Sequence, residues 1–314
     1  MHKKDKKRQV CGKRIASVIA VLAMTSFFTL YNWTNEVVKT AHITPLTPRI
    51  NIDNLIGKNE LSNQEIQIIS EQTGINMAIT EMLLEQEQEK KLLELQEAYY
   101  APVSIETIRT TPLTICEYVI DENGEYTKGT SIVNLQDGDI VITKNSRFLG
   151  WRNGHAGLVV DAEKGLVLEA VMLGTNTKLC SIRGWEKYPS FLVLRLKEEF
   201  KNTYEIEKVV SFAEQNLLGI PYQLHAGIWG RITGLFEKEY SGEEKEQKSK
   251  SRNKQDDELT QIAEGALSGT HCAHVIWYAY QQIGIDLDSD GGLLVTPYDI
   301  QNSPYLKIIQ SYGY

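Results

Sequence analysis

One cysteine in this sequence, Cys272, has the surroundings of a nucleophile. It opens a segment, residues 272–283, whose apolar residues recur every three or four positions, which predicts a buried amphipathic helix. Small or capping residues at 268–270 precede it, as is usual where a helix begins. A thiol in the first helical turn lies among unpaired N–H groups at the positive end of the helix dipole, and both favour the thiolate. The alternative is a small buried cysteine that only packs.

Two residues far upstream could activate such a thiol. His155 lies in the sequence Gly-His-Ala-Gly, before a predicted strand at residues 156–160, and Glu169 lies in the next predicted strand, residues 166–171. The short turn between them predicts an antiparallel hairpin, in which facing or diagonal side chains are about 4.5–8 Å apart. Glu169 could hold the imidazole in one tautomer, and the imidazole could take the proton from Cys272. A histidine beside glycine is more often structural, but a buried carboxylate needs a partner, and His155 is the nearest one.

The remaining patterns predict a domain of mixed α and β structure around these residues. Further strands are predicted at residues 114–120, 138–142 and 190–196, and an amphipathic helix at residues 204–218. Residues 242–258 contain no large apolar residue and are expected to form a disordered surface insertion. The turn-rich residues after 284 are expected to close the domain.

The N-terminal region predicts a membrane anchor. Residues 15–35 carry no charge and are mostly apolar, and their length approaches the roughly 20 residues that span a bilayer. Residues 1–14 carry seven basic residues and one acidic residue, so this tail is expected to stay in the cytoplasm. A cleavable signal peptide is the alternative. In either case the rest of the chain is expected outside the cytoplasm, as a single-pass protein of the cell membrane or as a secreted protein.

Between this anchor and the domain, the sequence predicts a linker and a helical spacer, residues 36–110. A capping box from Ser62 to Glu65 opens a short helix that Gly74 ends, and a longer helix is predicted at residues 77–99. We expect this helical hairpin to lift the domain, residues 111–314, off the membrane. A hairpin that binds a partner or covers a cleft is the alternative.

Six short motifs, taken in order, carry a family resemblance. They are Gly138-Asp-Ile-Val-Ile142, Gly154-His-Ala-Gly-Leu-Val-Val160, Leu168-Glu-Ala170, Gly219-Ile-Pro-Tyr222, Cys272 with Ile276-Trp-Tyr-Ala-Tyr280, and Gly284-Ile-Asp-Leu-Asp288 followed by Pro297-Tyr-Asp-Ile300. Over residues 130–314 the chain resembles the circularly permuted NlpC/P60 cysteine hydrolases, in the YiiX/YycO-like branch of the papain-like fold.

The resemblance implies an α+β fold in which a small antiparallel sheet packs on the nucleophile helix. It also implies that His155, Glu169 and Cys272 are the catalytic residues, with the histidine before the cysteine. Activities in the wider group include amide hydrolysis in peptidoglycan stem peptides and acyl transfer or hydrolysis on lipids. The chain departs from the family beside the cysteine, with Ala273 in place of the usual serine and His271 in place of a common aromatic residue.

These residues predict a hydrolase that needs neither metal nor cofactor. The thiolate would attack a carbonyl, and the backbone N–H of Cys272 would form part of an oxyanion hole. Tyr222 and His271 are candidates for binding the substrate or the oxyanion; a core tyrosine beside a turn is the alternative for Tyr222. A cell-wall peptide amide is the favoured substrate. A lipid acyl ester or thioester would need an apolar groove, which tryptophans could line, although core packing explains most of them: Trp151, Trp185, Trp229 and Trp277.

Composition and charge narrow the alternatives. The 314 residues are 42% hydrophobic and 24% charged, which suits one medium domain with attachments. The net charge is −8 despite the basic tail, so the rest of the chain is strongly acidic. An acidic domain argues against nucleic acid as a partner. A non-enzymatic, membrane-tethered binding protein of the same fold is a second hypothesis.

Zinc bound at the nucleophile segment is a third hypothesis. His271 and His274 would share a helix face, joined by His155 and His225 from elsewhere, but Cys272 would point about 100° away.

The four cysteines are too few for a disulfide-built scaffold. Cys116 and Cys180 either pair or remain two separate thiols.

Overall fold

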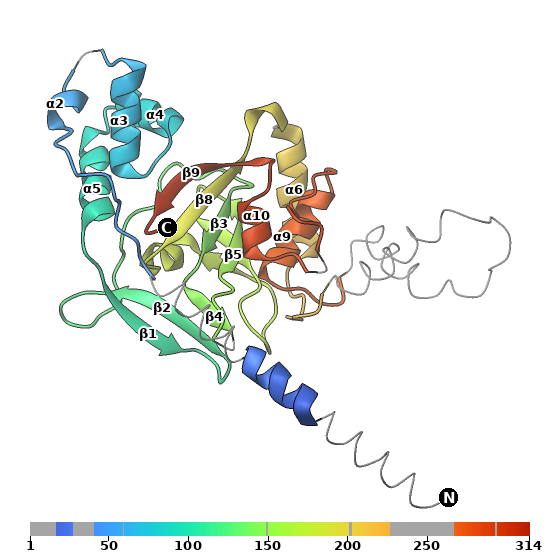
Figure 1. Ribbon diagram of the computed structural model, residues 1–314. Helices are drawn as coiled ribbons and strands as arrows, with labels where there is room; N and C mark the ends of the chain where they lie inside the picture. The colour runs from blue at the N-terminus through green and yellow to red at the C-terminus, as the bar shows by residue number, and fades with distance from the viewer. Residues whose placement is uncertain are drawn as a thin grey trace, which may run out of the picture.

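The structure is a computed structural model that describes residues 17–27, 41–58, 60–148, 150–200, 203–226, 267–292 and 294–314 (Figure 1). Its strands are β1 (Ser104–Arg109), β2 (Thr114–Ile120), β3 (Ile140–Thr143), β4 (Ser146–Phe148), β5 (His155–Asp161), β6 (Leu166–Glu169), β7 (Lys178–Ser181), β8 (Phe191–Leu196) and β9 (Leu306–Tyr312). Its helices are α2 (Asp53–Ile56), α3 (Asn63–Thr73), α4 (Met77–Glu85), α5 (Glu89–Tyr100), α6 (Thr203–Asn216), α9 (Cys272–Gln281) and α10 (Pro297–Gln301), with 3-10 turns η1 (Ile182–Lys187) and η2 (Glu198–Phe200).

The protein has an α+β fold built on antiparallel sheets, as the sequence predicted. One sheet has six strands in the order β7-β6-β5-β3-β8-β9, and the other has three strands in the order β1-β2-β4. All the strand pairs of both sheets are antiparallel. Each of the five predicted strands overlaps an observed strand, and β2 has the predicted bounds.

The six-stranded sheet is covered on both faces, and the alternation of side chains along its strands explains how. Successive residues of a strand point to opposite faces. Ile140 and Ile142 of β3 therefore pack with α6, α9 and α10 on one face. Val141, between them, packs with α3, α4 and α5 on the other.

The N-terminal helices share this second core, which differs from the detached spacer that the sequence predicted. Residues 74–76 are bonded to β9: the Ser311 N–H donates to the Gly74 carbonyl at 2.7 Å, and the Asn76 N–H donates to the Ile309 carbonyl at 2.9 Å. The apolar stripes of these helices bury against the sheet rather than against one another alone. They lie on the sheet face opposite α9, so they do not cover the nucleophile either (Figure 1).

Two expectations about local structure were wrong. The predicted helix at residues 77–99 is divided into α4 and α5, with a turn at Glu87, whose φ is 55°. The polar residues 85–91 offer nothing to bury, and the break allows α5 to pack back against α3. The predicted boundary at residue 110 also falls inside a hairpin, because β1 pairs with β2 along its whole length. Strand β1 was missed because its side chains are mostly exposed and show no apolar alternation.

Some predicted features lie wholly or partly outside the described residues. Of the predicted anchor, the structure describes residues 17–27, which are helical. In the part of the chain that the structure describes, no helix has the length and apolar character required to cross a membrane. The predicted insertion at residues 242–258 and Trp229 are outside the described ranges.

Candidate active site

The predicted nucleophile lies at the beginning of a helix, as expected. Cys272 is the first residue of α9 and its side chain is buried. The capping residue differs from the prediction, which placed it at residues 268–270. His271 caps the helix instead: its ring Nδ1 accepts a hydrogen bond from the backbone N–H of His274, at 3.4 Å. Thr270 bonds the His274 side chain, with 3.0 Å between Oγ1 and Nδ1.

The predicted histidine–glutamate pair is also formed. Strands β5 and β6 pair so that Leu158 faces Leu168, which places Glu169 diagonally across from His155. Nε2 of His155 lies 2.7 Å from Oε2 of Glu169, and both residues are buried. Because Glu169 occupies Nε2, Nδ1 is the ring nitrogen left for the sulfur of Cys272.

A third side chain, Trp185, supports this pair, a role that the sequence analysis did not predict. Its indole Nε1 donates to Oε1 of Glu169 at 2.9 Å. Its ring stacks on the imidazole of His155, with the ring centroids 5.2 Å apart and the planes 8° from parallel. Trp185 lies in η1, and only the return of the chain through β7 brings it over the pair. Both oxygens of Glu169 are thus occupied, and His155 is fixed in position and orientation.

Electrostatics favour a charged cysteine–histidine pair. Burial raises the pKa of Cys272, but the hydrogen bond to His155 and the charge of its imidazole outweigh it and lower the pKa to about 5. Burial lowers the pKa of His155, but its hydrogen bonds to Cys272 and Glu169 raise it to about 10. Between these values the pair is a thiolate and an imidazolium, which is the reactive form of a cysteine nucleophile.

The sulfur opens into a cleft of about 280 Å³. His155, Tyr222 and His271 line it beside Cys272, so all the predicted site residues except Glu169 reach the cleft itself. Burial raises the pKa of Tyr222, so its hydroxyl stays protonated and can donate. The rest of the wall is mixed. Its large apolar side chains are Phe148 at the end of β4, Val171, Met172 and Leu173 after β6, Leu224, and Leu294, Val295, Pro297 and Tyr298 around the start of α10. Its polar side chains are Thr114, Ser146, Arg152, Asn153 and Thr296.

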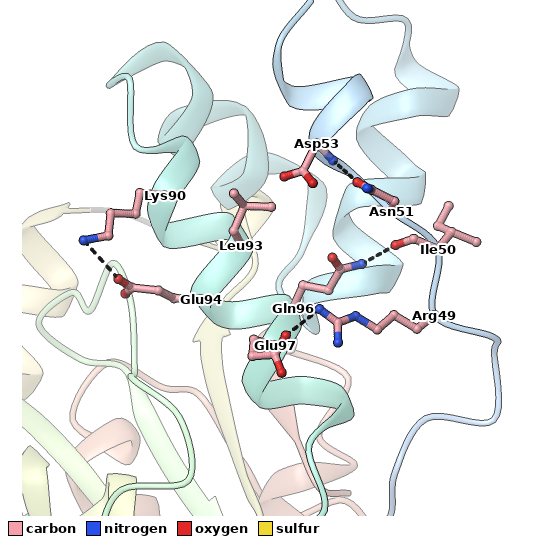
Figure 2. A pocket seen from close by; sticks show the side chains of 9 residues that line it. All are labelled: Arg49, Ile50, Asn51, Asp53, Lys90, Leu93, Glu94, Gln96 and Glu97. Carbon is pink, nitrogen blue, oxygen red and sulfur yellow. Dashed lines mark hydrogen bonds and ion pairs between the residues drawn. The ribbon is translucent and has the colours of Figure 1, made fainter.

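A larger hollow of about 680 Å³ lies elsewhere, between residues 49–53 and α5 (Figure 2). Its polar groups bond one another: Arg49 pairs with Glu97, and the Gln96 amide donates to the Ile50 carbonyl. Its lining residues include no cysteine or histidine, so it offers neither a thiol nucleophile nor an imidazole base.

The cysteines and histidines outside this set do not form the alternative sites considered above. Cys116 and Cys180 are both free thiols, on β2 and β7 in different sheets, so of the two alternatives they are separate thiols rather than a pair. Among the described residues, the group of side chains close enough to share a cation consists of Asp288, Asp290 and Asp299, not of the histidines around Cys272.

Comparisons with known proteins add no identification. Neither the protein-family models nor the curated proteins give a match to this chain.

Proposed function

We propose that this protein is a cysteine hydrolase of the permuted NlpC/P60 type, with Cys272 as nucleophile, His155 as proton carrier and Glu169 as the residue that orients it. The observation that carries the proposal is the buried assembly in which Glu169 and Trp185 fix His155 beside a thiol of lowered pKa. The antiparallel sheet packed on the nucleophile helix supports the family assignment, as does the histidine preceding the cysteine in the chain.

The reaction follows from these positions. The Cys272 thiolate attacks the carbonyl carbon of the substrate, a C–S bond forms, and the π electrons move to the carbonyl oxygen. When the intermediate collapses, His155 gives its proton to the leaving amine or alcohol, and an acyl-enzyme remains. Water then attacks the acyl carbon and loses its proton to His155, which releases the acid and returns the Cys272–His155 pair to its starting state.

A cell-wall peptide amide is the first candidate substrate, acted on outside the cytoplasm by a protein held at the membrane. This part of the proposal rests on the sequence: the apolar segment at residues 15–35, the basic tail before it and the family resemblance. No cofactor is required by the steps above.

The cleft rim favours a second candidate, a lipid acyl ester or thioester. Four exposed large side chains stand at the mouth of the cleft: Leu173, Leu224, Leu294 and Tyr298. Among the described residues that line the cleft, the one arginine, Arg152, is already paired with Glu117. Such walls suit an alkyl chain better than a charged stem peptide.

The position of the apolar N-terminal helix also favours this second candidate. Residues 17–27 are exposed and largely apolar. Phe27 at their end lies 6.3 Å from Trp151, as measured between ring centroids, and Arg152 and Asn153 follow Trp151 into the cleft wall. A helix that is apolar on every side requires an apolar environment. A bilayer around this helix would bring lipid close to the cleft.

One experiment tests the proposed function and separates its two substrates. The full-length protein and its Cys272→Ala variant are incubated with purified peptidoglycan and, separately, with phospholipid vesicles, and the products are identified by mass spectrometry. New muropeptides that require Cys272 support the amide, whereas Cys272-dependent release of fatty acid supports the lipid. Binding of either material with no product from the unmodified protein would favour the non-enzymatic alternative.

A further inference from the structure

The imidazole of His271 has a tautomer that the structure specifies. Its Nδ1 accepts the hydrogen bond that caps α9, so Nδ1 carries no proton while the cap is formed. A neutral imidazole with an unprotonated Nδ1 carries its proton on Nε2. His271 thus presents an Nε2–H donor for as long as it caps the helix.

That donor lacks a partner within the described part of the protein. Nε2 of His271 is buried, and no described group hydrogen-bonds it. His271 as a whole residue is only 6% exposed, yet it lines the cleft next to Cys272. A buried donor without an acceptor costs free energy, about 1–3 kcal/mol, unless a ligand supplies the acceptor. The unpaired N–H therefore indicates that a polar atom of a ligand binds beside the sulfur.

The helix supplies a second donor at the same place. The first N–H groups of an α-helix have no partner within the helix, and that of Cys272 is the first in α9. A carbonyl under attack by the sulfur has its oxygen close to the backbone of the attacking residue. We infer that the Nε2–H of His271 and the backbone N–H of Cys272 together form the oxyanion hole, in which the substrate's carbonyl oxygen gains its negative charge.

This inference rests on the proposed function and assigns His271 a catalytic role distinct from that of His155. His155 moves protons, whereas His271 keeps its proton and donates a hydrogen bond that strengthens as charge develops on the oxygen. Tyr222 is the competing donor, because its hydroxyl also stays protonated and faces the cleft. The two donors differ in how firmly they are oriented before substrate binds. The cap fixes the ring of His271, whereas the hydroxyl hydrogen of Tyr222 rotates freely.

Two reagents separate oxyanion stabilisation from thiol reactivity. Iodoacetamide alkylates sulfur by displacement of iodide at a CH₂ carbon, a step that places no negative charge on oxygen. p-Nitrophenyl acetate acylates sulfur through an oxyanion and releases p-nitrophenolate, which is measured by absorbance. Both rates are measured on the full-length protein across pH and compared on the plateau above the thiol pKa, so that a changed pKa in a variant does not distort the comparison.

The informative variant is His271→Ser, with His271→Gln as the conservative counterpart. Serine caps a helix well but cannot reach the oxyanion, whereas glutamine retains an N–H donor of similar reach. On the plateau, we expect His271→Ser to lose about 100- to 1000-fold in acylation and less than about threefold in alkylation. His271→Gln should recover at least about tenfold of the lost acylation rate. His225→Ser, at an exposed histidine, serves as the matched control.

The outcomes are distinguishable. Acylation by His271→Ser within about threefold of the unmodified protein would overturn the inference and leave the nucleophile in place, and a selective loss in Tyr222→Phe would assign the role to the hydroxyl. If Cys272 is not acylated in the unmodified protein, the proposed function itself fails. If His271→Ser does not fold, as judged by its melting curve, His271→Thr takes its place, because threonine also caps a helix and also lacks a donor of that reach. Acylation lowered no more than alkylation in His271→Thr would overturn the inference.

Discussion

The pH dependence of thiol alkylation provides the sharpest test of the site, with Cys272 and Cys180 compared in the same folded molecule. Burial and the nearby Glu169 carboxylate raise the pKa of Cys180 to about 11, whereas His155 outweighs the burial of Cys272 and lowers the pKa of that thiol to about 5. At pH 7, about 99% of Cys272 would be thiolate against about 0.01% of Cys180. At pH 6, the fractions become about 90% and about 0.001%.

Ionisation does not set the rate alone, because a thiolate of low pKa is intrinsically less nucleophilic. With a Brønsted coefficient of about 0.45, the thiolate of Cys180 is roughly 500-fold more nucleophilic than that of Cys272. The two effects oppose each other, but the thiolate fraction prevails. Iodoacetamide should therefore modify Cys272 about 20-fold faster than Cys180 at pH 7 and about 200-fold faster at pH 6.

The assay exposes the full-length protein to short pulses of iodoacetamide at each pH. The protein is then denatured, the remaining thiols are blocked with isotopically heavy reagent, and the two cysteine peptides are quantified by mass spectrometry. A preference for Cys272 that falls or stays constant between pH 7 and pH 6 would refute the thiolate–imidazolium pair. His155→Ala is the matched variant: it removes the partner that lowers the thiol pKa, so the preference at pH 6 should collapse.

Two further predictions concern the supports of the site. Trp185→Phe keeps a ring against His155 but removes the hydrogen bond to Glu169. A hydrogen bond to a charged group is worth about 1.5–3 kcal/mol, so acylation by p-nitrophenyl acetate should fall about tenfold or more. An unchanged acylation rate and an unchanged upper limb of the pH profile would show that the indole only packs. Glu117→Gln should lower the free energy of unfolding by about 3–5 kcal/mol in urea titrations, because it leaves the buried guanidinium of Arg152 without its carboxylate. Although burial raises the pKa of Glu117, hydrogen bonds from Arg152 and Asn145 lower it overall, so this stabilisation is lost as the pH falls through the lowered folded-state pKa and the variant should differ least in acid.

The sequence was sufficient where the signal was local. The helical spacing after Cys272 predicted α9, and the short turn between two apolar strands predicted the hairpin that joins His155 to Glu169. Each of these inferences spans fewer than twenty residues and depends on one periodicity. The positions of the three residues relative to one another then follow from the packing of α9 on β5.

The sequence was insufficient where contacts depend on the return of the chain. Trp185 reaches Glu169 because β7 carries the chain back along β6 before η1 begins. Strand β9 and residues 74–76 meet although more than two hundred residues separate them. The cap of α9 was assigned to the wrong residue because His271 is a less usual cap than the small residues before it.

Gly157 explains why Trp185 can pack against both His155 and Glu169. A Cβ atom at this position would lie 2.5 Å from Cγ1 of Val167 and 2.9 Å from Cζ2 of Trp185, closer than packed atoms approach. The glycine therefore leaves room for the indole, which can then stack on the imidazole of His155 and bond Glu169. His155 is thus held from the sheet side, without any contribution from substrate, while Cys272 is held by the first turn of α9. Both supports are complete without a ligand, so the ion pair is formed in the free protein; under the proposed mechanism, the cleft has only to bring a carbonyl to the sulfur.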